Sequence, residues 1–391
     1  MDLTYDEFLQ YVNEEDIKFI RLAFCDVYGN TKNISVMPNM LDEIHANGMT
    51  IDSQFIPGLS ELQSGYTSLH PDISTTKLLP WRPEHGKVIR MMCGLSDKDG
   101  NASPLDTRKI LSDAVESAKQ NGIAFRFGSR MEFYLMKLDE DGNPTDVPFD
   151  NAGYMDIAPL DKGENVRREI CLTLERMGIN PIGSYHGCGP GQNEIDFTSA
   201  DPLTAADNVE TFRMVVKTIA ARNGLYADFS PKPIPGRPGN GFHVNVLATK
   251  EGADDEVILR NSIAGILDHA YESTVFFNPS DLSYRRLGKD DAPLSISWAT
   301  QGTGRIIKLP ATNGKSSYLQ MCSPDSQANP YIVNALLIHS CIDGITRNLD
   351  PEDYTKKKSF PENRKEAGKT ASESEFIRSV LNESIIEAYC N

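Results

Sequence analysis

The sequence predicts a protein of mixed helices and strands, with a small, mostly β region over residues 1 to about 100 and a larger region of alternating strands and helices after it. Residues 17–35 alternate apolar and polar side chains around a Tyr-Gly-Asn turn, which is typical of a β-hairpin. Later segments repeat apolar residues every three or four positions, as amphipathic helices do. With 391 residues, of which 39% are hydrophobic, the chain is long enough for two or three domains.

The other strands and helices are predicted from the positions of proline and glycine residues and from the spacing of apolar residues. A strand is expected at residues 87–93, after a Pro-Trp-Arg-Pro breaker. A helix is expected at 106–120, because a proline precedes it and Asn-Gly follows it as a stop signal. Strands are expected next at 124–127 and 132–135. Four further helices are expected, at residues 165–177, 205–223, 253–271 and 330–348.

Three segments lack helical or strand periodicity. Residues 230–241, with four prolines and three glycines, and residues 278–291 are expected to be loops. Long loops inside a compact domain are usually functional when they are ordered. The charged residues 350–375 are expected to form a solvated surface segment.

Composition excludes several classes of partner. The formal net charge is −16 and the sequence pI is about 4.9, which disfavours a nucleic-acid surface. No apolar run reaches the roughly 18 residues of a membrane span, and the first residues lack the features of a signal peptide. We therefore expect a cytoplasmic protein that binds neither nucleic acid nor membranes. Seven scattered cysteines without a C-x-x-C pair are interpreted as reduced thiols.

Three side chains of the kinds that bind metals, Glu132, Glu194 and His243, stand beside expected strands or glycine-rich turns. Each alone is more often a surface or hydrogen-bonded structural residue. Their surroundings add several motifs in order along the chain, among them Gly-Tyr-Met-Asp at 153–156, Pro-Gly-Gln-Asn-Glu at 190–194, Pro-Lys-Pro-Ile at 231–234 and Ser-Pro-Asp-Ser-Gln-Ala-Asn-Pro-Tyr at 323–331. With these motifs the sequence resembles the glutamine synthetase superfamily over nearly its whole length.

The resemblance implies the α+β glutamine synthetase fold. Residues 1–100 would form a β-grasp N-terminal domain, and residues 101–391 a large catalytic domain whose curved antiparallel sheet holds the active site. It further implies ATP-dependent ligation of ammonia to glutamate in a site with two divalent metal ions. Phosphoryl transfer between anions needs such ions, and Mg²⁺ or Mn²⁺ prefers carboxylate ligands.

The resemblance assigns Glu132 and Glu194 to the first metal site and His243 to the second. The third glutamate of the first site corresponds to Gly187, and the two glutamates of the second site correspond to Arg130 and Gln320. At about 4 Å and an effective dielectric of about 20, a unit charge contributes about 4 kcal/mol, here as repulsion instead of attraction. We therefore expect at most one Mg²⁺ or Mn²⁺, and ATP binding is in doubt.

Positions that the family uses for phosphate and substrate have changed too. Cys322 stands where the family has a substrate-binding arginine, and Lys308 and Thr303 stand where it has two arginines that act on the phosphate. Arg305 is close enough to Thr303 in sequence to substitute for the second arginine.

Other functional positions of the family are retained. The resemblance gives Arg286 and Gly239 a role in substrate binding, and Asp52 that of the aspartate lent to a neighbouring subunit's site. Asp291 stands one residue out of register with the flap glutamate.

These residues predict a diverged site that binds a small carboxylate or amino acid and does not make glutamine. Two alternatives remain open: a catalytically silent binding or regulatory relative, and an enzyme that uses the same funnel for nucleotide-independent chemistry, with Cys188 or Cys322 as a nucleophile. A homo-oligomer is expected. We expect a single ring, because the sequence ends where the family's helices that join two rings should begin.

Overall fold

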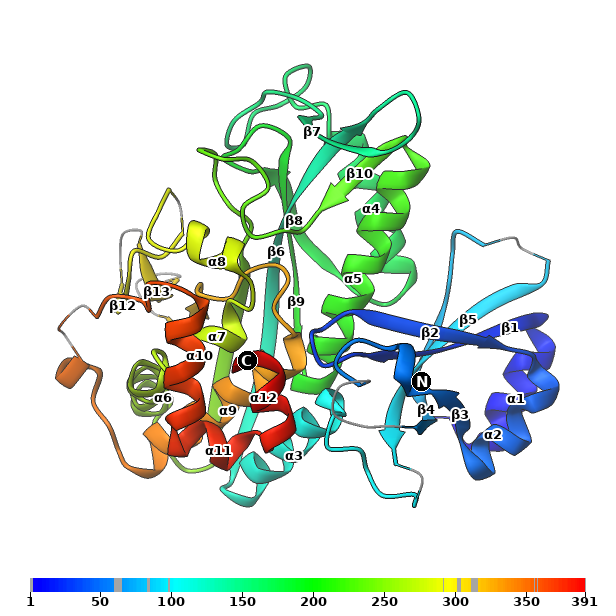
Figure 1. Ribbon diagram of the computed structural model, residues 1–391, viewed down its shortest axis with the longest axis horizontal. Helices are drawn as coiled ribbons and strands as arrows, with labels where there is room; N and C mark the ends of the chain where they lie inside the picture. The colour runs from blue at the N-terminus through cyan, green and yellow to red at the C-terminus, as the bar shows by residue number, and fades with distance from the viewer. Residues whose placement is uncertain are drawn as a thin grey trace. The chain divides into compact units, whose positions relative to one another are not determined.

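The structure is a computed structural model that describes residues 3–59, 65–82, 85–97, 99–290, 292–300, 304–310, 316–354, 356 and 358–390. The chain divides into two compact units (Figure 1). One unit contains residues Met1–Ile110 with Arg176–Gly178, and the other contains Leu111–Glu175 with Ile179–Asn391.

The N-terminal unit is built on a five-stranded sheet in the order β2-β1-β5-β4-β3. Its strands are β1 (Ile17–Cys25), β2 (Thr31–Val36), β3 (Met49–Asp52), β4 (Tyr66–Leu78) and β5 (Lys87–Ser96). The β1 and β2 strands form the expected hairpin, and β1 runs parallel to β5. Two helices, α1 (Tyr5–Glu14) and α2 (Leu41–Asn47), were not expected. The sequence signal for α1 is a capping box between Thr4 and Glu7.

The larger unit contains a nine-stranded sheet in the order β12-β13-β14-β11-β6-β9-β8, with β10 and β7 also paired to β6. Its strands are β6 (Ile123–Leu138), β7 (Pro144–Pro148), β8 (Pro181–His186), β9 (Gln192–Ala200), β10 (Leu225–Asp228), β11 (Phe242–Lys250), β12 (Ser295–Ala299), β13 (Arg305–Lys308) and β14 (Leu319–Met321). All pairs are antiparallel except β12 with β13. The two strands expected at 124–127 and 132–135 are one long strand, β6, because residues 128–131 between them continue the pairing with β11.

The expected long helices are confirmed as α3 (Thr107–Gln120), α4 (Glu164–Arg176), α5 (Pro202–Arg222), α6 (Asp255–His269) and α9 (Pro330–Thr346). Helix α5 packs on β6 (Figure 1). There Phe133 of β6 contacts Phe212 of α5 and Phe229, with ring centroids 6.0 and 5.6 Å apart. This aromatic cluster places the core on one face of the sheet and leaves the other face to polar side chains.

Two expectations about irregular segments are wrong. Residues 278–291 contain a short helix, α8 (Asp281–Arg286), capped by Ser280, and α7 (Thr274–Phe277) lies just before them. The segment expected to be solvated contains α10 (Arg364–Glu373), whose Ala367 and Ala371 are buried. Helices α11 (Glu375–Val380) and α12 (Glu383–Cys390) complete the C-terminal part. In the described part of the chain, no helix is long and apolar enough to cross a membrane.

Candidate functional site

One face of the nine-stranded sheet carries a continuous set of polar side chains, which we call the polar face. Residues that are direct cross-strand partners project from the same side of a sheet, and so do residues two positions apart on one strand. The strand registers therefore place the following side chains together on that side: Lys308, Gln320, Asn245, His243, Arg130, Glu132, Asp196, Glu194 and Tyr185.

Burial separates the polar face from the core. On β6, Met131 and Phe133 are fully buried, whereas Arg130 and Glu132, which alternate with them, are partly accessible. The same alternation occurs on β11, where His243 is partly accessible between buried neighbours. The sheet therefore presents its charged residues away from the α5 side.

The structure brings together Glu132, Glu194 and His243. Glu132 and Glu194 are direct cross-strand partners on β6 and β9. The amide of Gly241 donates to Glu132 Oε2 at 2.6 Å, and the Tyr185 hydroxyl donates to Glu194 Oε2 at 2.9 Å. His243 Nε2 lies 3.9 Å from Glu132 Oε1, and its Nδ1 is buried without a hydrogen-bond partner.

The electrostatics of this group are those of two crowded carboxylates beside several cations. Burial, together with the negative charge of Glu194, raises the pKa of Glu132 to about 8. Burial lowers the pKa of His243 well below its usual value, and the positive charges of Arg130, Lys308 and Arg286 lower it further. The imidazole of His243 is therefore neutral at physiological pH.

Arg130 occupies a position that the resemblance gives to a metal-binding glutamate. Its guanidinium makes a two-point ion pair with Asp196, with Nε 2.7 Å from Oδ1 and Nη2 3.2 Å from Oδ2. Asp196 is the direct partner of Arg130 on β9, and His243 is its direct partner on β11. The Tyr185 ring centroid lies 5.9 Å from the guanidinium carbon. The positive charge of Arg130 is therefore held in one place on the polar face, next to His243 and two residues before Glu132.

Gln320 and Cys322 form a neutral region on the β11 side of the polar face. Gln320 Nε2 donates to Asn245 Oδ1 at 2.9 Å, and Lys308 is the direct partner of Gln320 on β13. The thiol of Cys322 lies 3.7 Å from Gln320 Oε1. Burial raises the pKa of Cys322 to about 11, which keeps it protonated and disfavours a nucleophilic role. Cys188, the other candidate nucleophile, is exposed.

At Gly187, the third expected ligand position of the first metal site, the space for a side chain is already filled. A Cβ atom added to Gly187 would lie 2.8 Å from Gln192 Cγ. Gln192 is itself fixed, because it accepts from the Gly189 amide at 2.8 Å and donates to the Gly239 carbonyl at 3.1 Å. The Gln192 side chain therefore prevents a carboxylate from entering the site from position 187.

Restoring the family's glutamate by Gly187→Glu is expected to destabilise the protein by about 1–3 kcal/mol, because the new side chain must displace Gln192. Urea unfolding measures this change. Gly183→Glu on β8 is the matched control, since a Cβ at Gly183 meets nothing within 4 Å. Adding Gln192→Ala to Gly187→Glu should recover part of the loss. Equal stability of the variants at 187 and 183 would contradict this steric account.

Arg286 and Gly239 lie beside the same group. Arg286 on α8 is 2% exposed, and its guanidinium donates to the carbonyl oxygens of Ser323 at 3.0 Å and Cys322 at 3.4 Å. A Cβ on Gly241 would lie 2.9 Å from Arg286 Nη2 and 2.7 Å from His243 Nε2. A Cβ on Gly239 would lie 2.2 Å from the Pro231 carbonyl oxygen, so only glycine fits there.

The remaining predicted residues are not part of this arrangement in the described structure. Asp52 belongs to the N-terminal unit, where it is exposed and accepts a hydrogen bond from the Gln54 amide at 2.9 Å. Asp291 and Thr303 lie outside the described residues.

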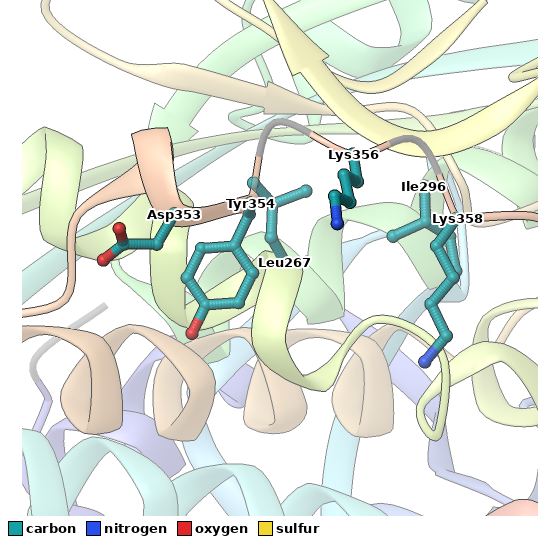
Figure 2. Close-up of a pocket in the computed structure, with 6 residues that line it drawn as sticks. All are labelled: Leu267, Ile296, Asp353, Tyr354, Lys356 and Lys358. Carbon is teal, nitrogen blue, oxygen red and sulfur yellow. The ribbon is translucent and has the colours of Figure 1, made fainter.

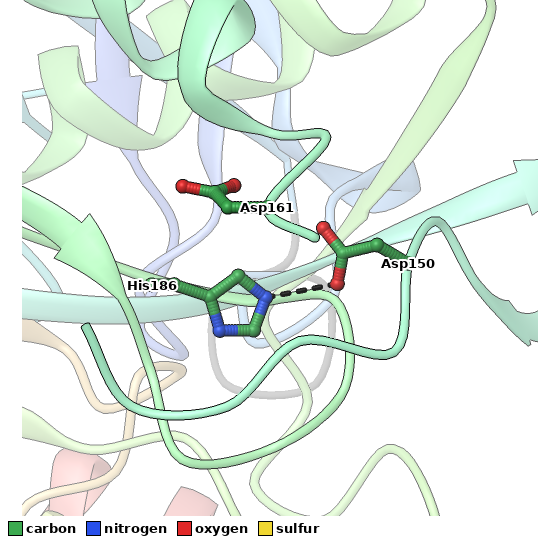
Figure 3. Close-up of side chains that lie close together, drawn as sticks. All are labelled: Asp150, Asp161 and His186. Carbon is green, nitrogen blue, oxygen red and sulfur yellow. Dashed lines mark hydrogen bonds and ion pairs between the residues drawn. The ribbon is translucent and has the colours of Figure 1, made fainter. Parts of the chain in front are cut away.

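Two other clusters have donor atoms within 4.8 Å of one another: Asp150 with Asp161 and His186, and Asp268 with His269 and Asp343. In the first cluster, His186 Nε2 lies 2.9 Å from Asp150 Oδ1 (Figure 3), and His186 Nδ1 lies 2.8 Å from the Gly187 carbonyl oxygen. In the second, His269 bridges Glu272 and Asp343. Both histidines use both ring nitrogens within the protein, so we interpret these clusters as structural.

The polar face offers few carboxylate ligands for a divalent ion. Glu132, Glu194 and His243 are not among the described groups with donor atoms within 4.8 Å of one another. Glu132 and Glu194, which are direct partners on β6 and β9, are the residues that would hold an ion. At the positions that the resemblance gives to the second ion, Arg130 and Gln320 offer a cation and an amide in place of carboxylates.

A separate cavity of about 380 Å³ is lined by Leu267, Ile296, Asp353, Tyr354, Lys356 and Lys358 (Figure 2). Its polar groups do not converge on one point. Lys358 Nζ lies over the Tyr271 ring, 3.9 Å from the centroid. We assign this cavity no role in the site.

Comparison with known proteins agrees with this architecture. The model of the glutamine synthetase beta-Grasp domain matches residues 16–98, and that of the glutamine synthetase catalytic domain matches residues 104–391. The glutamine synthetase of Methanosarcina mazei is 36% identical, over 99% of this chain and 92% of its own length. That of Clostridium saccharobutylicum is 37% identical, over 93% and 86%.

Solved structures show the same fold. A structure of GmaS without ligand superposes with a TM-score of 0.85 at 24% identity, covering 98% of this chain and 93% of GmaS. A GmaS/ADP complex gives a TM-score of 0.83 at 23% identity, covering 98% and 94%.

Proposed function

Because the chain belongs to the glutamine synthetase family, with its β-grasp and catalytic domains, we propose that it binds a small carboxylate or amino acid on the polar face and does not make glutamine. Glutamine synthetases are oligomeric and bind nucleotide and amino-acid ligands. We extend the amino-acid ligand and assembly into a homo-oligomer to this chain.

The observation that carries the proposal is the ion pair between Arg130 and Asp196. It places a cation where the family's second metal ion needs an anion. Three cations, Arg130, Lys308 and Arg286, face Glu132, Glu194 and Asp196, and the raised pKa of Glu132 keeps that carboxyl largely protonated at physiological pH. A divalent ion is therefore not required to neutralise this site.

The ligand would be held by groups that are already oriented. Arg286 is buried and donates to backbone carbonyls, and among the described residues no carboxylate is within ion-pair distance of it. Asp325 and Glu132 act on Arg286 only through space, and a ligand carboxylate would add a direct ion pair. The Gly241 amide and the Tyr185 hydroxyl fix Glu132 and Glu194, which would accept from an amino group. When a single divalent ion is bound between these two carboxylates, it would supply positive charge for an anionic ligand.

A second candidate is a carboxylate-amine ligase that uses ATP, which the identity to proteins named glutamine synthetase favours. Titration with Mn²⁺ separates the two functions. We expect at most one Mn²⁺ per chain, with or without ATP, because only Glu132 and Glu194 remain as paired carboxylate ligands. Two Mn²⁺ per chain together with ATP binding at micromolar concentration would favour the ligase and contradict our proposal.

A further inference from the structure

Resting on the proposed function, we propose that Arg130, held by Asp196, replaces a divalent metal ion as the positive charge that binds an anionic group of the ligand. The ligand class is a short molecule with two carboxylates, one directed to Arg286 and the other to Arg130. Its binding is independent of metal ions.

The geometry fixes the guanidinium in one orientation. Two of its nitrogens, Nε and Nη2, are used by Asp196, and a two-point pair of this kind does not rotate freely. The third nitrogen, Nη1, makes no hydrogen bond in the part of the chain that the structure describes. The Arg130 side chain is 31% exposed and that of Asp196 is 23% exposed. The guanidinium is therefore anchored from one side and accessible from another.

The surroundings of Arg130 favour an anion over a metal ion. Its direct partner on β11 is His243, and Lys308 lies on the same face of the sheet, on β13, as the direct partner of Gln320. Lys308 makes no ion pair among the described residues. On the side of Arg130 that faces β13, away from Asp196 on β9, a divalent cation would be repelled by Arg130 and Lys308, whereas a carboxylate would be attracted by both.

The adjoining region of the polar face offers no competing negative charge. Gln320 is paired with Asn245 as a neutral amide pair, and the buried Cys322 thiol beside it stays protonated. On this side of Arg130 the ligand carboxylate would meet only cations and neutral groups. Compared with the family positions that they match, Arg130 adds a positive charge, Gln320 lacks a negative charge, and the Cys322 thiol is neutral. We therefore assign this part of the polar face to anion binding.

Calorimetric titration with L-glutamate and L-glutamine tests this inference, because the two probes differ by a single carboxylate. The full-length protein should bind L-glutamate with the same affinity in EDTA and in Mn²⁺, and more tightly than L-glutamine. Arg130→Met should weaken L-glutamate binding about tenfold to hundredfold, the range for a hydrogen bond to a charged group, and remove the preference over L-glutamine. Arg126→Met is the matched control, since Arg126 lies on the same strand but is exposed and donates to the Ser199 carbonyl. It should leave both affinities unchanged.

The double variant Arg130→Met, Asp196→Asn guards against a fold defect caused by an unpaired Asp196, and it too should lose the preference for L-glutamate. Loss of L-glutamate binding in EDTA would overturn the metal independence. If both Arg130 variants still prefer L-glutamate over L-glutamine, the role of Arg130 is wrong, although the proposed function stands. If the unaltered protein binds neither probe in Mn²⁺ or EDTA, the proposed function itself is wrong, and the inference falls with it.

Discussion

With ATP, ammonia, L-glutamate and Mg²⁺ or Mn²⁺, the protein is expected to form glutamine far more slowly than about 1 per second, a rate at the low end for enzymes. Removing one electrostatic stabiliser of a transition state commonly costs about a hundredfold to a thousandfold in rate. Here a ligand position is occupied by Gly187, another by Arg130 and a third by Gln320. The rate is measured in two ways, as release of phosphate and as formation of γ-glutamyl hydroxamate.

A glutamine synthetase assayed under the same conditions provides the positive control. The hydroxamate assay is the more informative of the two, because it detects γ-glutamyl transfer as well as ATP-driven synthesis. Turnover by this protein near about 1 per second in either assay would show that the altered ligand positions still support phosphoryl transfer.

Glu132, Glu194 and His243, which the sequence placed beside expected strands or glycine-rich turns, lie on the neighbouring strands β6, β9 and β11. The partner of Arg130 was missed, although a signal for it existed. If Glu132 and Glu194 face each other across an antiparallel pair, Arg130, two residues before the first, must face Asp196, two residues after the second. The pairing therefore follows from the same register that joins the two glutamates.

That Gln192 fills the space for a side chain at position 187 could not be predicted from the sequence. It depends on the direction of the Gln192 side chain, which is set by contacts with the Gly189 amide and the distant Gly239 carbonyl. Helix α8 was missed for a different reason. It spans only six residues, too few for a periodic pattern, and its burial comes from tertiary packing of Ser283 and Arg286. Its capping residue, Ser280, was the one local signal.

Arg167→Met is expected to destabilise the protein by about 3–5 kcal/mol, because it removes one partner of a buried ion pair. Arg167 on α4 contacts both carboxylate oxygens of Asp161, at 3.1 and 2.5 Å, and donates to Asn193 Oδ1 at 2.7 Å. The side chains of Arg167 and Asp161 are 5% and 2% exposed. Asp161 lies in the buried cluster with His186 (Figure 3), so its uncompensated charge would have little access to water.

The matched control for this prediction is Arg168→Met, one residue further along α4, where the side chain is exposed. Urea unfolding of both variants should give a large loss for Arg167→Met and a change within about 0.5 kcal/mol for Arg168→Met. Because Asn193 precedes Glu194 on β9, Arg167 also connects this buried pair to the polar face. Arg167→Met should therefore weaken L-glutamate binding even under conditions in which the variant is fully folded. If its stability lies within about 1 kcal/mol of that of Arg168→Met, the buried pair does not hold this part of the site together.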